Sequence, residues 1–132
     1  MTPELYWLAL SAIFLLICWL PYIVNRSLVR GAARALGNPR DDDKPQSGWA
    51  VRAQKAHQNG VENLVVMATL VIVAHLAKIS SSTTILMVQL YFWARIAHYV
   101  VFTIGIPYAR TLAFFVGWLS TAWFALAILG LV

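Results

Sequence analysis

One stretch of the sequence carries charged and amide side chains into an otherwise apolar segment. Residues 52–63 read Arg-Ala-Gln-Lys-Ala-His-Gln-Asn-Gly-Val-Glu-Asn and lead directly into an apolar run. At helical spacing, four polar residues fall on one face within a wedge of roughly 80°. They are Arg52, Lys55, Asn59 and Glu62. Ionisable side chains are costly inside a membrane and usually face a bundle interior or a polar cavity, so this stripe predicts a binding or reaction site.

More cations follow in the next apolar segments, and they indicate the charge of the ligand. Arg95 and His98 interrupt one such segment, and Arg110 follows a Gly-Ile-Pro turn. Arginine keeps its charge when buried, so Arg95 needs an anionic partner, and a Glu62–Arg95 pair between two helices is one structural interpretation. Glu62 is the only carboxylate inside the predicted spans. Even with that pair, several cations have no acid beside them, which predicts an anionic ligand. They are Arg52, Lys55, His57 and Arg110.

Metal chemistry is not predicted. The sequence has no paired His/Cys spacing typical of a metal site, and its single cysteine, Cys18, lies in an apolar run where a buried small hydrophobe is expected. The acidic run Asp41–Asp43 lies among Pro and Gly residues and is typical of a solvated loop.

The elements that must position these residues are membrane helices. Hydrophobic residues make up 61% of the 132 residues and charged residues 11%, against about 25% charged in ordinary soluble domains. Four segments approach or exceed the roughly 20 apolar residues that cross a bilayer. We therefore predict an all-α membrane protein, a four-transmembrane-helix bundle forming one domain over residues 1–132. The expected spans are residues 5–24, 49–77, 84–104 and 108–132.

The distribution of basic residues predicts the orientation. The loop at residues 26–48 is rich in arginine, whereas the connection between the second and third spans holds only Lys78. The positive-inside rule places that loop in the cytoplasm and both termini on the opposite side. The net charge of +5 is explained by inner-leaflet lipid and an anionic ligand, without a nucleic-acid partner. Because the start Met-Thr-Pro-Glu has no basic region, a cleaved signal peptide is not expected.

Three motifs resemble those of the membrane-associated proteins in eicosanoid and glutathione metabolism, the MAPEG family. They are Arg-Ala-x-x-Ala-His-x-Asn-x-x-Glu-Asn at residues 52–63, Ala-Arg-x-x-His at 94–98, and Gly-Ile-Pro-Tyr-x-Arg-Thr at 105–111. This family includes microsomal glutathione transferases and membrane prostaglandin E and leukotriene synthases. The resemblance covers nearly the whole chain, including the four spans and the long first loop.

The resemblance implies a homotrimer that binds glutathione between subunits near the cytoplasmic face. Asn59, Glu62 and Arg95 match positions that hold glutathione, and His98 matches a position that lines the site. Arg110 matches the arginine that stabilises the glutathione thiolate and is the predicted catalytic residue. The chemistry agrees, because arginines suit the carboxylates of glutathione, Glu62 suits its ammonium, and a nearby guanidinium favours the thiolate.

The chain departs from the family pattern at several of these positions. Gln58 stands where active members have arginine, and Phe102 and Phe114 stand where they have tyrosine. Thr111 stands where the prostaglandin synthase has serine. The loss of a cation and two hydroxyls is expected to weaken glutathione binding or to change which anion is held.

Two functions are therefore carried forward. One is a membrane glutathione-dependent transferase or peroxidase acting on a lipophilic electrophile, with glutathione or a similar thiol as co-substrate. The other is a non-catalytic membrane scaffold or binding protein, in which Glu62 and Arg95 only clamp two helices together. A small multidrug transporter is disfavoured, because the first span has no carboxylate.

Overall fold

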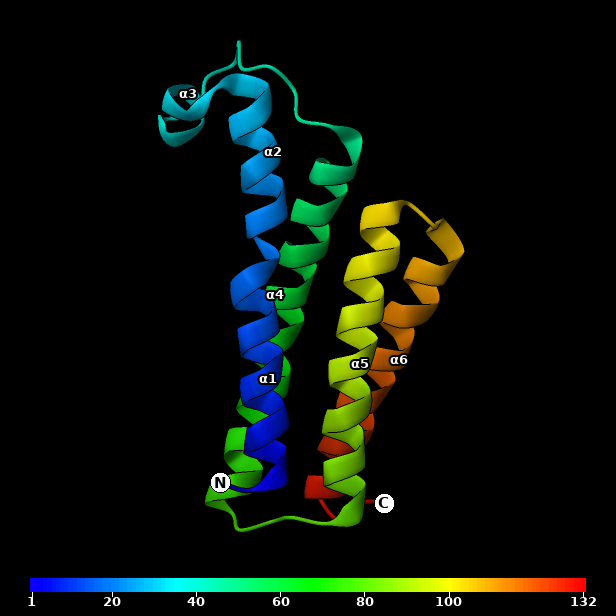
Figure 1. Ribbon diagram of the computed structural model, residues 1–132. Helices are drawn as coiled ribbons and strands as arrows, with labels where there is room; N and C mark the ends of the chain where they lie inside the picture. The colour runs from blue at the N-terminus through cyan, green and yellow to red at the C-terminus, as the bar shows by residue number, and fades with distance from the viewer.

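The computed structural model describes residues 1–132 as a bundle of helices without strands (Figure 1). Both termini and the turn between α4 and α5 lie at one end of the bundle, which we call the terminal end. The α2–α4 connection and the α5–α6 turn lie at the other end, which we call the loop end. The helices are α1 (Pro3–Cys18), α2 (Leu20–Arg30), α3 (Ala32–Leu36), α4 (Gly48–Leu76), α5 (Ser82–Ile104) and α6 (Pro107–Ile128).

Four helices are long and apolar enough to cross a membrane, as the sequence predicts. The first of them, Pro3–Arg30, combines α1 and α2 and runs beyond the predicted end of the first span. It continues because its polar residues find partners in the loop that returns beside it. Asn25 donates to the Ser47 hydroxyl at 2.9 Å and Arg26 donates to the Gln46 side-chain oxygen at 3.2 Å.

A break at Trp19 separates α1 from α2. Pro21 follows it and has no backbone N–H to donate to the preceding turn. The carbonyl of Cys18, at the end of α1, accepts a hydrogen bond at 2.9 Å from the Tyr99 hydroxyl of α5. The break is therefore tied to a neighbouring helix, and Cys18 itself is buried, as expected for a small hydrophobe.

Local signals define the ends of α5. Ser81 and Thr84 form a capping box at its start, with each side chain bonded to the other residue's backbone N–H. At its end Gly105 adopts φ 95°, a left-handed conformation that favours glycine, and Pro107 opens α6. These signals set the tight turn that holds the start of α6 beside the end of α5.

The apolar core joins α4, α5 and α6 in the half of the bundle nearer the terminal end. Its largest buried side chains include Tyr91, Phe124 and Met67. Small residues bring other helices close to α4. Gly60 faces Leu15 of α1, and a Cβ at position 60 would come within 2.6 Å of that leucine. Most large apolar side chains of the long helices point outward, as expected for helices in lipid.

Candidate functional site

A cavity of about 200 Å³ lies at the loop end, where α4, α5 and α6 meet. It contains three residues that the sequence predicts for the site: Asn59, His98 and Arg110. His98 is buried in its wall, whereas Arg110 is exposed at its mouth. The complete lining is Asn59, His98, Phe102, Arg110, Thr111 and Phe114.

Arg95 lies next to this cavity but inside the protein, with 3% of its surface exposed. Its Nη1 donates to Asn59 Oδ1 at 3.2 Å, and its Nη2 donates to the Phe114 carbonyl at 3.2 Å. The guanidinium carbon also lies 5.6 Å from the ring centres of both Tyr91 and Phe114. Two hydrogen bonds and two aromatic faces thus hold the charge, and they join α5 to α4 and α6.

The Glu62–Arg95 pair considered from the sequence does not form within the chain. Glu62 is exposed on the surface of α4, where it accepts a hydrogen bond from Gln58 at 3.4 Å. All three ion pairs of the chain instead join Arg30 or Arg34 to loop aspartates. Packing of α4 against α5 instead brings Asn59, three residues closer to the loop end, to the guanidinium, which bonds its amide oxygen.

Arg110 makes no ion pair. Its guanidinium carbon lies 4.5 Å from the centre of the Phe102 ring, a cation–π contact that leaves its N–H groups free to bind an anion. The protein thus places an unpaired, orientable cation at the mouth of a cavity that also offers the Asn59 amide and the Thr111 hydroxyl.

Arg52 lies beside Arg110, and the two share a smaller cavity of about 80 Å³ next to the α5–α6 turn. Arg52 donates to the carbonyls of Thr103 and Ile104 at 3.1 and 3.5 Å, which satisfies two free carbonyls at the end of α5. Arg52 therefore supports the turn that carries Arg110, in addition to its predicted role at the site.

The structure does not bring Lys55, His57 or Glu62 to either of these two cavities. Lys55 and Glu62 are exposed on α4. His57 is half-buried, and its Nδ1 is 2.9 Å from the Tyr22 hydroxyl of α2. The helical stripe is real, but only its Arg52 and Asn59 members face α5 and α6.

One buried polar residue escaped the sequence analysis. Glu4 was expected to precede the first span, yet it lies in the first turn of α1 with 3% of its surface exposed. Its Oε1 accepts hydrogen bonds from Thr84 at 2.7 Å and Ser80 at 2.8 Å. Glu62 is therefore not the only carboxylate within the helices. The Thr-Pro-Glu start typical of a helix N-terminus was the available signal.

Four membrane-spanning helices with a polar cavity at one end of the bundle are typical of small integral membrane proteins that bind a ligand between helices. The sequence model of the MAPEG family matches residues 5–130 of the chain. The chain belongs to the MAPEG family, which includes glutathione transferases and related proteins. A comparison with curated proteins found no match.

Proposed function

We propose that this protein is a glutathione-dependent transferase or peroxidase that acts on lipophilic electrophiles within the membrane. The observation that carries the proposal is Arg110, a cation without a carboxylate partner at the mouth of a polar cavity. Family membership points to glutathione as the thiol. The positive-inside rule favours a loop end that faces the cytoplasm, from which glutathione would enter.

The chemistry requires a thiolate near Arg110. A nearby guanidinium stabilises the anionic sulfur and so lowers the pKa of a bound thiol, whose proton passes to solvent. In a transfer reaction the sulfur attacks an electrophilic carbon. An S–C bond forms, and the bond from that carbon to its leaving group breaks. In a peroxidase reaction the thiolate attacks the terminal oxygen of the hydroperoxide. An S–O bond forms, the O–O bond breaks, and the leaving alkoxide takes a proton from solvent to give the alcohol, which leaves glutathione as its sulfenic acid. A second glutathione then completes the reaction, giving glutathione disulfide and water.

A groove beside the site supports entry of the lipophilic substrate from the bilayer. A groove of about 320 Å³ lies between α4 and α6, and it begins at Asn63, one turn along α4 from Asn59. Apolar side chains such as Val66, Leu70 and Trp118 line most of it. Such a surface favours an apolar molecule that arrives through the bilayer.

The proposal includes assembly as a homotrimer, as the family resemblance implies. Glu62 supports it, because an exposed carboxylate midway along a membrane helix is costly unless it faces protein or a polar cavity. In a trimer, Glu62 and Lys55 would face a neighbouring subunit and could complete the glutathione site there.

A non-catalytic scaffold is the second candidate, and the arrangement around Arg95 favours it. Asn59, Phe114 and the aromatic rings bond or cover the guanidinium, so it can serve as a helix clamp without any ligand. Phe102 and Phe114 also give the cavity apolar walls. A scaffold would bind no thiol and would show no thiol-dependent activity.

Thiol-dependent turnover of a lipophilic electrophile or hydroperoxide by the purified protein separates these two functions. Arg110→Ala should lower turnover by about 100-fold or more, as expected when a group that stabilises a reacting anion is removed. Arg110→Lys should retain part of the activity, because it keeps the charge. Arg40→Ala removes an exposed loop arginine and is the matched control, with turnover unchanged.

Calorimetric titration with glutathione provides a test independent of the electrophile chosen. Saturable binding that is weakened in Arg110→Ala and preserved in Arg40→Ala supports the enzyme. Absence of binding at millimolar glutathione, together with equal turnover in wild type and Arg110→Ala, would rule the proposed activity out in favour of the scaffold.

A further inference from the structure

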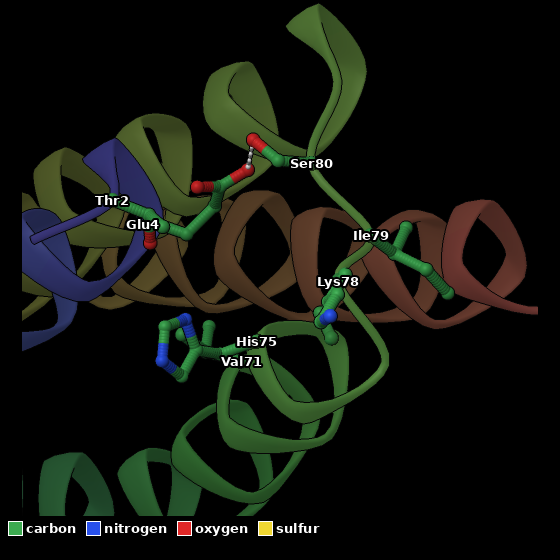
Figure 2. A pocket seen from close by; sticks show the side chains of 8 residues that line it. Thr2, Glu4, Val71, His75, Lys78, Ile79 and Ser80 are labelled. Atoms are coloured by element: carbon green, nitrogen blue, oxygen red, sulfur yellow. Dashed lines mark hydrogen bonds between the residues drawn. The ribbon is translucent and has the colours of Figure 1, made fainter.

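Two cavities away from the candidate site combine basic side chains with a carboxylate. At the terminal end, His75 and Lys78 share the lining of a cavity of about 270 Å³ with Glu4. Figure 2 shows the Glu4 carboxylate turned towards Ser80. Among residues 30–44, three basic residues share a cavity of about 180 Å³ with two aspartates. In both places the lining that holds the positive charges also includes an acid.

The small cavity beside the α5–α6 turn differs, because it holds two arginines and no acid. Its volume is about 80 Å³, and its lining is Arg52, Phe102, Gly105, Ile106, Pro107 and Arg110. Neither arginine forms an ion pair within the chain. Two like charges beside one small cavity repel each other, and an anion placed between them would offset that repulsion.

The structure holds both guanidinium groups at this cavity. Arg52 donates to the carbonyls of the last two residues of α5 and lies against Gly105, where a Cβ would be 3.1 Å from its Nε. The guanidinium carbon of Arg110 lies 4.5 Å from the ring centre of Phe102, which is also in the lining. A guanidinium has five N–H donors, so both arginines keep donors for an anion.

The surface around the turn is apolar, which places this cavity at the edge of the hydrocarbon region. Ile104 and Leu112 flank the turn and expose 63% and 68% of their surface, and Tyr108 exposes 88%. Tyrosine is enriched where membrane helices meet the headgroups. Figure 1 shows the turn at a lower level than the α2–α4 connection, and so nearer the middle of the bundle. The cavity is therefore within reach of lipid headgroups.

We infer that this cavity binds a phosphate monoester, the headgroup of an anionic lipid such as phosphatidic acid, through Arg52 and Arg110. Guanidinium groups match phosphate oxygens in geometry and form paired hydrogen bonds with them. A phosphate monoester carries a charge of roughly −1.5 to −2 at pH 7, which balances two arginines. A phosphodiester carries only one negative charge, and phosphocholine adds a cation that the arginines repel.

The size and the orientation of the cavity agree with this ligand. At roughly 30 Å³ for each water, 80 Å³ is the space of two or three water molecules, enough for one small oxyanion but not for a tripeptide. The positive-inside rule favours a loop end in the cytoplasm, and anionic lipids are concentrated in that leaflet. Inorganic phosphate carries the same chemistry, and the experiment separates it from the lipid.

The inferred lipid site has a regulatory consequence, which rests on the proposed function. Arg110 lines both this cavity and the larger one. A phosphate bound here would engage the guanidinium that the proposed function assigns to the thiolate. Membranes that contain phosphatidic acid should therefore weaken the binding of glutathione.

The test is lipid retention measured by native mass spectrometry after reconstitution in an equimolar mixture of phosphatidic acid, phosphatidylglycerol and phosphatidylcholine. The expected retention is greatest for phosphatidic acid and least for phosphatidylcholine. Equal retention of the three lipids would overturn the proposal. A parallel titration with inorganic phosphate identifies the source of the ligand. Retention that persists at millimolar phosphate supports the lipid, whereas displacement would assign the site to soluble phosphate and overturn the lipid as its ligand.

Variants of the two arginines separate this site from general attraction to anionic lipid. Arg52→Gln and Arg110→Gln each remove one cation and should lower the preference for phosphatidic acid by about tenfold or more. Arg110 is exposed, so Arg110→Gln tests the site even if Arg52→Gln loosens the turn. Arg40→Gln removes the same charge from an exposed loop position and is the matched control, with the preference unchanged. A preference that survives both cavity variants in folded protein would overturn the proposal.

Glutathione titrations in phosphatidylcholine discs, with and without phosphatidic acid, test the regulatory consequence. Weaker binding in the presence of phosphatidic acid is the expected result. Equal affinity in the two membranes would overturn the competition at Arg110. Lipid retention is measured without glutathione, so absence of glutathione binding in both membranes would count against the proposed function and its regulation, and not against the lipid site.

Discussion

Two arginines on adjacent helices lie in opposite environments. Arg95 is buried, and its guanidinium is held by Asn59, the Phe114 carbonyl and two aromatic rings. Arg110 is exposed at the cavity mouth, and its one described partner is the face of Phe102. Both were predicted for one site from the sequence, yet their surroundings differ in how many hydrogen-bond donors remain free.

The difference separates a structural charge from a functional one. Burying a guanidinium is costly, and the cost is offset only when the protein supplies partners for its donors. Both Nη atoms of Arg95 have such partners, although its Nε is buried without one, so the removal of Arg95 should mainly affect stability. Arg110 keeps most of its donors free, so its removal should mainly affect ligand binding.

The largest expected effect on stability comes from Arg95→Ala. The change removes two hydrogen bonds from a charged group and leaves a cavity, so the free energy of unfolding should fall by about 3 kcal/mol. Denaturation by sodium dodecyl sulfate, followed by circular dichroism, measures this loss. Arg95→Met keeps the apolar stem and should lose less. A loss below about 1 kcal/mol in Arg95→Ala would contradict the structural role assigned to this residue.

A smaller effect is expected from Gly117→Ala, which tests the same cluster from α6. A Cβ at position 117 would collide with the guanidinium of Arg95. The hydrogen bonds of Arg95 limit its retreat, so the variant should lose about 2 kcal/mol through overpacking. Gly48→Ala is the control, because a Cβ there lies at an ordinary 3.5 Å from Arg52. Equal melting temperatures for the two variants would show that Arg95 moves freely.

Arg110→Ala should have a still smaller effect on stability, below about 1 kcal/mol, because it removes only an exposed cation–π contact. The same denaturation curves measure it beside Arg95→Ala. A loss as large as that of Arg95→Ala would remove the distinction between the two arginines, and reduced turnover in Arg110→Ala would then no longer indicate a chemical role.

The smallest expected effect comes from the loop, where Arg30 and Arg34 form ion pairs with Asp43. Asp43 accepts the backbone N–H of Arg40 at 3.0 Å and lies beside Arg34 and Arg30, and these contacts hold the pKa of Asp43 below its ordinary value. A carboxyl group whose pKa is lowered on folding stabilises the folded state at pH values above its ordinary pKa of about 3.9. That stabilisation is lost as the pH falls from there through the lowered pKa. Hydrogen exchange of the loop at residues 37–47, corrected for intrinsic rates, should therefore speed up below about pH 4.

Asp43→Asn provides the matched comparison for that titration. It should exchange faster than the wild type at neutral pH and show no additional acid step in the same window. An acid step of equal size in the variant would assign the change to another group.

Much of the fold could be predicted, because lipid constrains it strongly. Apolar length identified the four spanning helices, and Gly105 and Pro107 marked the α5–α6 turn. The helix ends were less predictable where tertiary contacts decide them. Asn25, which would ordinarily end a membrane segment, remains helical because Ser47 returns to accept its hydrogen bond.

The sequence predicted which residues gather at the site better than it predicted which of them contact one another. Spacing placed Asn59, His98 and Arg110 at one end of the bundle, and the structure gathers them around one cavity. Spacing could not decide whether Asn59 or Glu62 meets Arg95, since both lie on the same face and differ by less than one turn of α4. Packing of α4 against α5 decides this, and no local pattern encodes it.

The unequal lengths of the helices have a consequence for access. Pro3–Arg30 and α4 have 28 and 29 residues, whereas α5 and α6 have 23 and 22. At 1.5 Å per residue the first two reach about 42 Å and the others about 34 Å. Because the helices start at a similar level at the terminal end, the bundle forms a step at the loop end (Figure 1). The cavity lined by Asn59 and Arg110 lies between α4 and the two shorter helices, on the low side of that step. In the proposed enzyme a water-borne molecule would therefore be screened on one flank only, while a membrane-dissolved molecule would enter sideways without leaving the bilayer.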